Sequence, residues 1–178
     1  MDPDPSSYFF FLNVLKTIDI SLIVPLLILL VLLVSSALIS GSEVAFFSLK
    51  PKDLDGLKQD KSPNYDTMVE LLDHPKTLLA TILISNNFIN VGIVILSSYL
   101  TGEVFDFTEY AKWIEITVQV VAITFLILLF GEVLPKVYAN KNPLGFSTFM
   151  SRPMFVMRRA FRPVSLVLVR STNLIEKR

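Results

Sequence analysis

Glu132 stands at the end of a long apolar run, and Pro135 follows three residues later in "LLFGEVLPK". If the run crosses a membrane, an ionised carboxylate at this depth costs at least about 2.5 kcal/mol and usually needs a partner. Pro135 has no amide hydrogen, so it cannot donate to the Gly131 carbonyl as a helical residue would. The sequence therefore predicts a helix break at Pro135, with the Gly131 carbonyl oxygen and the Glu132 carboxylate side by side. The plainer alternative is a carboxylate at the aqueous end of a helix that Pro135 stops.

A second group of polar residues ends the first apolar run, in "ALISGSEVAFF". In a helix Ser40 and Glu43 are three residues apart and share a face, and Gly41 lets another backbone approach closely. Packing of small residues, with the serines bonded back to their own helix, would explain the serines and the glycine. It does not explain Glu43, so Ser40 is a candidate ligand and Glu43 a further one.

Three asparagines interrupt the second apolar run, in "ATILISNNFINVG". Asn86 and Asn90 are four residues apart and lie on one face of a helix, whereas Asn87 points about 100° away. Their amides are costly in lipid unless they meet partners or an ion. One asparagine would be enough to hold two helices together by hydrogen bonds. The three together therefore favour a binding site.

These groups offer only oxygen ligands. The chain has no cysteine and a single histidine, His74, which excludes thiolate and multi-histidine metal sites. Hard oxygen ligands suit Mg²⁺, Ca²⁺ or Na⁺, and such a cation would offset the charge of Glu132. No nucleophile and base pair is recognisable, so an enzyme is not expected. The candidate metal ligands are Ser40, Asn86, Asn90, Gly131 and Glu132, with Glu43 and Asn87 as further candidates and Pro135 as the helix break.

Positioning these groups requires membrane spans. Hydrophobic residues make up 52% of the chain and the mean hydropathy is +0.59, which is too apolar for an ordinary soluble domain. Uncharged runs predict spans at about 20–42 and 77–101, long enough to cross a core about 30 Å thick. A third span is predicted at about 113–134; its uncharged part, 116–131, is too short alone, so Glu132 is needed to complete it. The predicted fold is an all-α membrane protein, with a three-span domain over residues 20–142 after an N-terminal extension, 1–19.

The charged segments indicate the topology. Residues of about 50–76 and 143–178 are predicted to form amphipathic helices beside the membrane, on its cytoplasmic surface. The second segment is basic, and its arginines and prolines argue against a fourth span and favour contact with lipid phosphates. The positive-inside rule puts the N-terminus outside and the C-terminus in the cytoplasm of a multi-pass protein of the plasma (inner) membrane. Sixteen basic and sixteen acidic residues cancel, so no nucleic-acid partner is expected.

Three stretches together resemble the transmembrane domain of the CNNM/CorC family of magnesium transporters: "SGSEVAFFSL", "LLATILISNNFIN" and "FGEVLPKVYAN". Their order and spacing cover nearly the whole chain after residue 20. The resemblance implies a homodimer of three-span protomers with an inward-facing polar cavity, and Mg²⁺ export driven by Na⁺ entry. The cytoplasmic CBS modules into which family members normally continue are expected to be absent here. The family's ion-site residues fall on Ser40, Asn86, Asn90, Gly131 and Glu132.

Two functions of different classes follow from these features. In the first, the protein is a membrane transporter that binds Mg²⁺ in an inward-facing pocket between the three spans, with Na⁺ as the coupling ion. In the second, it is a membrane-embedded interaction or anchoring module whose polar residues only mediate helix packing. Glu132 separates the two hypotheses, because helix packing does not need an ionised carboxylate at a helix break. The expected partners are a second copy of the chain and membrane lipids.

Overall fold

All regular elements of the described chain are helices. The computed structural model describes residues 20–59, 63–104 and 112–176, with side chains as far as residue 164, and these residues contain no strand. Within them three helical segments are long and apolar enough to cross a membrane, which confirms the predicted all-α membrane fold. The predicted extension, 1–19, lies outside the described residues.

The first two spans are antiparallel helices joined by two short helices. A 3₁₀ turn, η1 (Ile20–Leu22), leads into α2 (Ile23–Phe47), and the second span is α5 (Pro75–Val104). Helix α2 continues past the predicted end of the span at residue 42, so Glu43 lies inside the helix. Pro75 occupies the first position of α5, where an amide hydrogen would have no acceptor within the helix, so proline is tolerated there.

The third span stays helical through Pro135, so the predicted helix break is not found. It consists of α6 (Lys112–Leu126), the π-helix η2 (Ile127–Val133) and α7 (Leu134–Lys141). The backbone amide of Leu134 donates to the Leu129 carbonyl, five residues back, as in a π-turn. The wider turn places the irregularity just before Pro135, and this is how the helix accommodates a residue without a donor.

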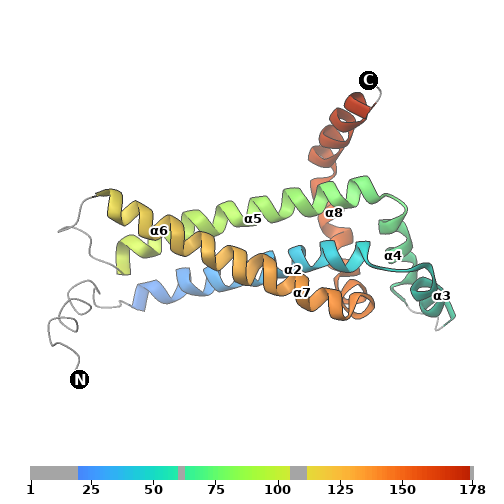
Figure 1. Ribbon diagram of the computed structural model, residues 1–178, viewed down its shortest axis with the longest axis horizontal. Coiled ribbons are helices and arrows are strands. Elements are labelled where there is room, and N and C mark those ends of the chain that lie inside the picture. The colour runs from blue at the N-terminus through green and yellow to red at the C-terminus, as the bar shows by residue number, and fades with distance from the viewer. Residues whose placement is uncertain (1–19, 60–62, 105–111, 177–178) are drawn as a thin grey trace.

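The three spans run side by side along the long axis of the molecule, and the remaining helices gather at one end (Figure 1). There α3 (Pro51–Gln59) and α4 (Tyr65–Leu72) connect the first two spans, and α8 (Pro143–Glu176) passes crosswise against α2 and α5. Although α8 contains two prolines, it is a single helix and is not among the candidate spans of the described chain. A crosswise helix at the end of the spans suits the predicted position along a membrane surface.

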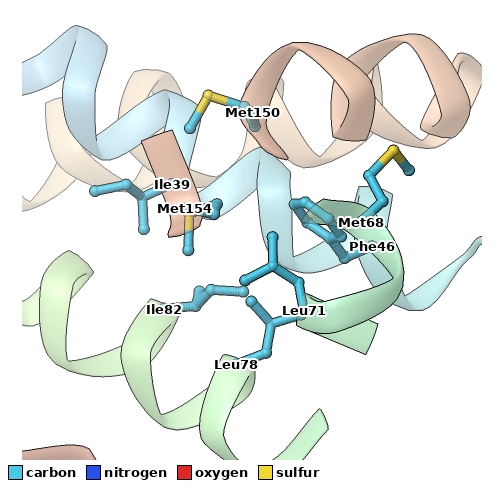
Figure 2. Packing of buried hydrophobic residues seen from close by; sticks show 8 residues of the cluster. All are labelled: Ile39, Phe46, Met68, Leu71, Leu78, Ile82, Met150 and Met154. Atoms are coloured by element: carbon cyan, nitrogen blue, oxygen red, sulfur yellow. The ribbon is translucent and has the colours of Figure 1, made fainter. Parts of the chain in front are cut away.

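The main core lies where the crosswise helix meets the ends of the first two spans. Figure 2 shows α8 methionines, Met150 and Met154, directed toward side chains of α2, α4 and α5. Along the rest of the spans most large apolar side chains face outward, as Val31, Phe88 and Val121 do. Acyl chains cover such faces in a membrane, so the spans need little core of their own. The core residues are Ile39, Phe46, Met68, Leu71, Leu78, Ile82, Met150 and Met154.

Gly41 is used for packing within the chain. A Cβ atom at this position would lie 2.6 Å from the Phe146 ring of α8, so only glycine lets the ring approach the helix. The small-residue face of "SGSEVA" was expected to receive another transmembrane helix. In the structure the Phe146 ring occupies the space at Gly41.

Candidate cation site

Three side-chain oxygens from two spans converge near the middle of the bundle. The hydroxyl oxygen of Ser36, on α2, lies 3.0 Å from Asn86 Oδ1 and 2.8 Å from Asn90 Oδ1, both on α5. A hydroxyl carries one hydrogen, so it can donate to only one of the two amide oxygens at a time. We call these three oxygens the Ser36 centre. It is rich in acceptors and short of positive charge, which is an arrangement that a hard cation can complete.

The third span reaches this centre through Gly131. A Cβ atom at Gly131 would lie 3.1 Å from the Ser36 hydroxyl oxygen, closer than nearly all real contacts of that kind. Because residue 131 has no side chain, the backbone of η2 approaches Ser36 this closely without displacing its hydroxyl. The three spans meet at this point, through Ser36 of α2, Asn86 and Asn90 of α5 and Gly131 of the third span.

Two further hydroxyls beside the centre have no hydrogen-bond partner among the described residues. Ser40 lies one turn after Ser36 on α2, and Ser85 directly precedes Asn86 on α5; both are 1% exposed. A buried polar group without a partner normally costs about 1–3 kcal/mol, and in native proteins it often marks a functional site. The candidate ligand Ser40 is therefore available to bind, although it is not one of the three converging oxygens.

A cluster of charged side chains lies further along α2 and the third span, and it consists of Glu43, Glu132 and Lys136. Lys136 Nζ lies 3.0 Å from Glu43 Oε2 and 3.3 Å from Glu132 Oε1, and all three side chains are about one-third exposed. Glu132 therefore has a protein cation as its partner, and its side chain bonds to Lys136 and not to the Ser36 centre. Two carboxylates and one ammonium leave this cluster with one net negative charge.

The cluster opens to a hollow of about 420 Å³ on the outside of the bundle, lined in part by Glu43, Lys136 and Phe47. Ser36, Ser40 and Glu43 succeed one another at intervals of four and three residues, so they share one face of α2. This polar stripe leads from the hollow toward the Ser36 centre.

Asn87 is not brought to the centre. Its amide nitrogen donates to the Leu83 carbonyl of its own helix at 2.9 Å, and the residue is exposed. Its position on α5 follows the predicted rotation of about 100° away from Asn86. Its hydrogen bond stays within α5, whereas Asn86 and Asn90 bond to Ser36 of α2.

Sequence reasoning missed Ser36 and Lys136. Ser36 precedes Ser40 by one turn, and Lys136 follows Glu132 by one turn, so the same four-residue rule used for the asparagines would have found both. In the described part of the chain no three Asp, Glu, His or Cys side chains gather as a metal site. A cation held at the Ser36 centre would therefore depend mainly on neutral oxygens.

The fold and the site define a multi-span helical membrane protein with a polar, oxygen-lined centre between its spans. The chain belongs to the CNNM family: the model of the cyclin M transmembrane N-terminal domain matches residues 27–178. This confirms the family to which the three sequence stretches pointed.

Several proteins of this kind are similar in sequence. A "metal transporter cnnm-4" of Caenorhabditis elegans is 30% identical over 85% of this chain, and a "UPF0053 protein" of Haemophilus influenzae is 29% identical over 78%. A "UPF0053 inner membrane protein YfjD" of Escherichia coli is 30% identical over 68% of the chain. The chain spans about a third of the length of these relatives, 28–32% of each.

Proposed function

We propose that this chain is the membrane part of a transporter that binds Mg²⁺ at the Ser36 centre and exports it in exchange for Na⁺. The observation that carries the proposal is the convergence of Ser36, Asn86 and Asn90 oxygens around a single hydrogen. Membership of the CNNM family and a relative named as a metal transporter support it.

Binding would replace a hydrogen bond by a metal ion. When the Ser36 hydroxyl turns its hydrogen away, its lone pairs and those of the two amide oxygens can face one ion. Ser40 and the Gly131 carbonyl could supply further oxygen ligands, and water molecules would complete the octahedral shell that Mg²⁺ requires. This gives Ser40, Asn86, Asn90 and Gly131 the roles that the family resemblance implies, and it adds Ser36 to them.

In this mechanism Glu132 contributes negative charge beside the hollow that Glu43 and Lys136 line. With Glu43 and Lys136 it forms a cluster of net negative charge at the end of the polar stripe that borders the hollow. Such a cluster raises the local concentration of cations without holding one tightly. Exchange requires that the centre bind Mg²⁺ better when it faces the cytoplasm and Na⁺ better when it faces outward, because an ion shifts conformations only through its differential affinity.

A flux measurement tests the transport function. The chain is reconstituted in vesicles that contain Mg²⁺ and a fluorescent Mg²⁺ indicator, and Na⁺ is supplied on the opposite side. We expect Na⁺-dependent loss of Mg²⁺ that Ser36→Ala abolishes and Asn87→Ala leaves intact, because Asn87 bonds only to its own helix. Flux that is equal in Ser36→Ala and the unaltered chain would exclude the Ser36 centre from the transport path.

One observation favours the second function, a membrane-embedded interaction or anchoring module. The Ser36 hydroxyl links α2 to α5 directly, as polar residues do when they only hold helices together. In that case Ser36→Ala would lower thermal stability by a similar amount with and without Mg²⁺. If the site binds the ion, Ser36→Ala removes the Mg²⁺-dependent part of the stability, because a ligand stabilises only the state that binds it.

A further inference from the structure

A cavity of about 460 Å³ lies at the junction of α4, α5 and α8, and its described lining shares no residue with the candidate cation site. Among the described residues its walls carry three arginines and one acid, Glu70, so two positive charges are in excess there. The bundle thus presents an electropositive cavity that plays no part in the proposed transport. Its lining residues are Glu70, His74, Thr77, Phe155, Arg158, Arg159 and Arg162.

Arg158 forms a fixed wall of the cavity. One of its guanidinium nitrogens donates to the Glu70 carbonyl oxygen at 3.0 Å, another pairs with the Glu70 carboxylate, and the group lies 5.5 Å from the centre of the Phe155 ring. Its side chain is only 16% exposed. The single acid of the cavity is therefore already committed to Arg158, and Arg158 contributes little free charge.

Arg159 and Arg162 supply the excess charge. They are three residues apart on α8, so their side chains lie on neighbouring parts of one face. Both are exposed, and neither has a carboxylate partner among the described side chains. Two guanidinium groups with spare donors beside a cavity suit the oxygens of a phosphate, which arginine binds by paired hydrogen bonds.

The cavity lies at the depth where the second span begins. His74 and Thr77 line it, and they flank Pro75, the first residue of that span. The positive end of the α5 helix dipole adds to the potential there. Further along α8 the Phe161 ring packs 6.3 Å from the ring of Phe88 on α5, so aromatic contacts also join these two helices. A cavity at the start of a span is placed where lipid headgroups meet the protein.

We propose that this cavity binds the phosphate of an anionic phospholipid. Arg159 and Arg162 hold the phosphate oxygens, and Phe155 lies against the glycerol end of the lipid. A lipid is favoured over a soluble phosphate because the cavity sits at the membrane surface, where headgroup phosphates are concentrated. A bound lipid would fix α8 against α4 and α5 independently of any transported ion.

The test uses the whole chain in lipid-free detergent micelles, titrated with short-chain phosphatidylglycerol, with zwitterionic phosphatidylcholine, and with inorganic phosphate. Native mass spectrometry counts the bound molecules. We expect phosphatidylglycerol to bind at least about tenfold more tightly than phosphatidylcholine, and the double variant Arg159→Gln/Arg162→Gln to lose that preference. The matched control is Arg152→Gln, which removes an exposed arginine of the same helix outside the cavity and should keep the preference.

A second variant tests the proposal by a gain of affinity. Glu70→Gln removes the only acid, while the Glu70 carbonyl oxygen still holds Arg158 in place, so phosphatidylglycerol should bind several-fold more tightly. Equal binding of the two lipids, equal losses in the double variant and in Arg152→Gln, or no gain in Glu70→Gln would each overturn the proposal. Inorganic phosphate that binds as tightly as phosphatidylglycerol would overturn the lipid assignment.

Discussion

At the scale of single residues, the candidate cation site is distinguished by a shortage of hydrogen-bond donors: its three oxygens share one hydrogen. Ser36 offers one hydrogen to the amide oxygens of Asn86 and Asn90, and Gly131 brings the third span against the same hydroxyl. In the proposed function a cation would relieve this crowding of acceptors, and the absence of a side chain at Gly131 lets the third span lie close to the Ser36 hydroxyl. The nearby carboxylates of Glu43 and Glu132 are paired with Lys136, so in the proposed function they would act through their charge.

Gly131→Ala should weaken Mg²⁺ binding without unfolding the protein. The new Cβ would lie 3.1 Å from the Ser36 hydroxyl oxygen and push the serine away from the asparagines. Alanine favours helix over glycine by about 1 kcal/mol, so the helix itself is not weakened. Calorimetric titration should show a loss of Mg²⁺ affinity of about tenfold or more.

The control for this change is Gly92→Ala. A Cβ at Gly92 would meet Leu32 at 3.6 Å, an ordinary contact, so Mg²⁺ affinity should be unchanged. Equal Mg²⁺ affinity in the Gly131→Ala variant and the unaltered chain would show that close contact with Ser36 is not needed for binding.

Glu132→Gln should keep the fold and weaken Mg²⁺ binding. Lys136 retains Glu43 as a partner at 3.0 Å, and the amide is nearly the size of the carboxylate. The net charge of the cluster falls from minus one to zero, so the attraction for a divalent cation is lost. We expect Mg²⁺ affinity to fall by about tenfold or more, with a steeper loss at low salt, where charges act over longer distances. An unchanged Mg²⁺ affinity at low salt would show that the charge of Glu132 does not contribute to Mg²⁺ binding.

At the scale of elements, the third span derives its shape from the π-helix η2. Pro135 cannot complete an α-helical bond to Gly131, and the chain responds by widening the turn before it to i−5 bonding. The widened turn is the part of the span that contains Gly131 and Glu132. The irregular backbone therefore carries two of the candidate ligands, Gly131 and Glu132.

Pro135→Ala should stabilise the span and impair the site. A new amide hydrogen at this position allows ordinary α-helical bonding, and proline is about 3 kcal/mol less favourable than alanine inside a helix. If η2 then returns to α-helical register, Gly131 rotates away from Ser36. The thermal midpoint should rise without Mg²⁺, while the further rise on adding Mg²⁺ should shrink. A raised midpoint with the full Mg²⁺ effect would show that the π-helix is not required for binding.

The three spans and one face of the candidate site could be predicted from the sequence, whereas the π-helix and the role of Ser36 could not. Uncharged runs revealed the spans, and the four-residue spacing of Asn86 and Asn90 revealed the face that meets α2. The choice between Ser36 and Ser40 depends on how far α2 is rotated and shifted against α5, which a periodic pattern leaves open because both serines share a face. The π-helix was missed because a proline shows only that one donor is lacking, and the chain can respond by a break, a kink or a wider turn.

At the scale of the whole molecule, one end of the bundle is packed and the rest of each span is covered by apolar side chains that face outward. The core joins α2, α4, α5 and α8 at that end, while residues such as Val31, Phe88 and Val121 are more than 60% exposed. Lipid can cover these faces, and so can a second copy of the chain. Because Gly41 already contacts Phe146, a dimer would have to use other parts of the spans.

We predict that the chain forms a symmetric dimer through the outward faces of its spans. Mass measurement in mild detergent and crosslinking in membranes should both give twice the chain mass. Gly41→Ala should lower the thermal midpoint, because its Cβ would lie 2.6 Å from the Phe146 ring, but it should leave the dimer intact. A chain that is monomeric at every concentration would contradict the prediction, and a monomer produced by Gly41→Ala alone would place the interface on α2 near that residue.

Mg²⁺ binding to four forms of the chain tests the central claim most directly: the unaltered chain, Ser36→Ala, Asn90→Ala and Asn87→Ala, each titrated by calorimetry with Mg²⁺. The account predicts that the first two substitutions each weaken binding by about tenfold or more, since each removes one of the converging oxygens. Asn87→Ala should bind as the unaltered chain does, because Asn87 bonds only to its own helix. Equal affinity in all four forms, or no Mg²⁺ binding by the unaltered chain, would contradict the account.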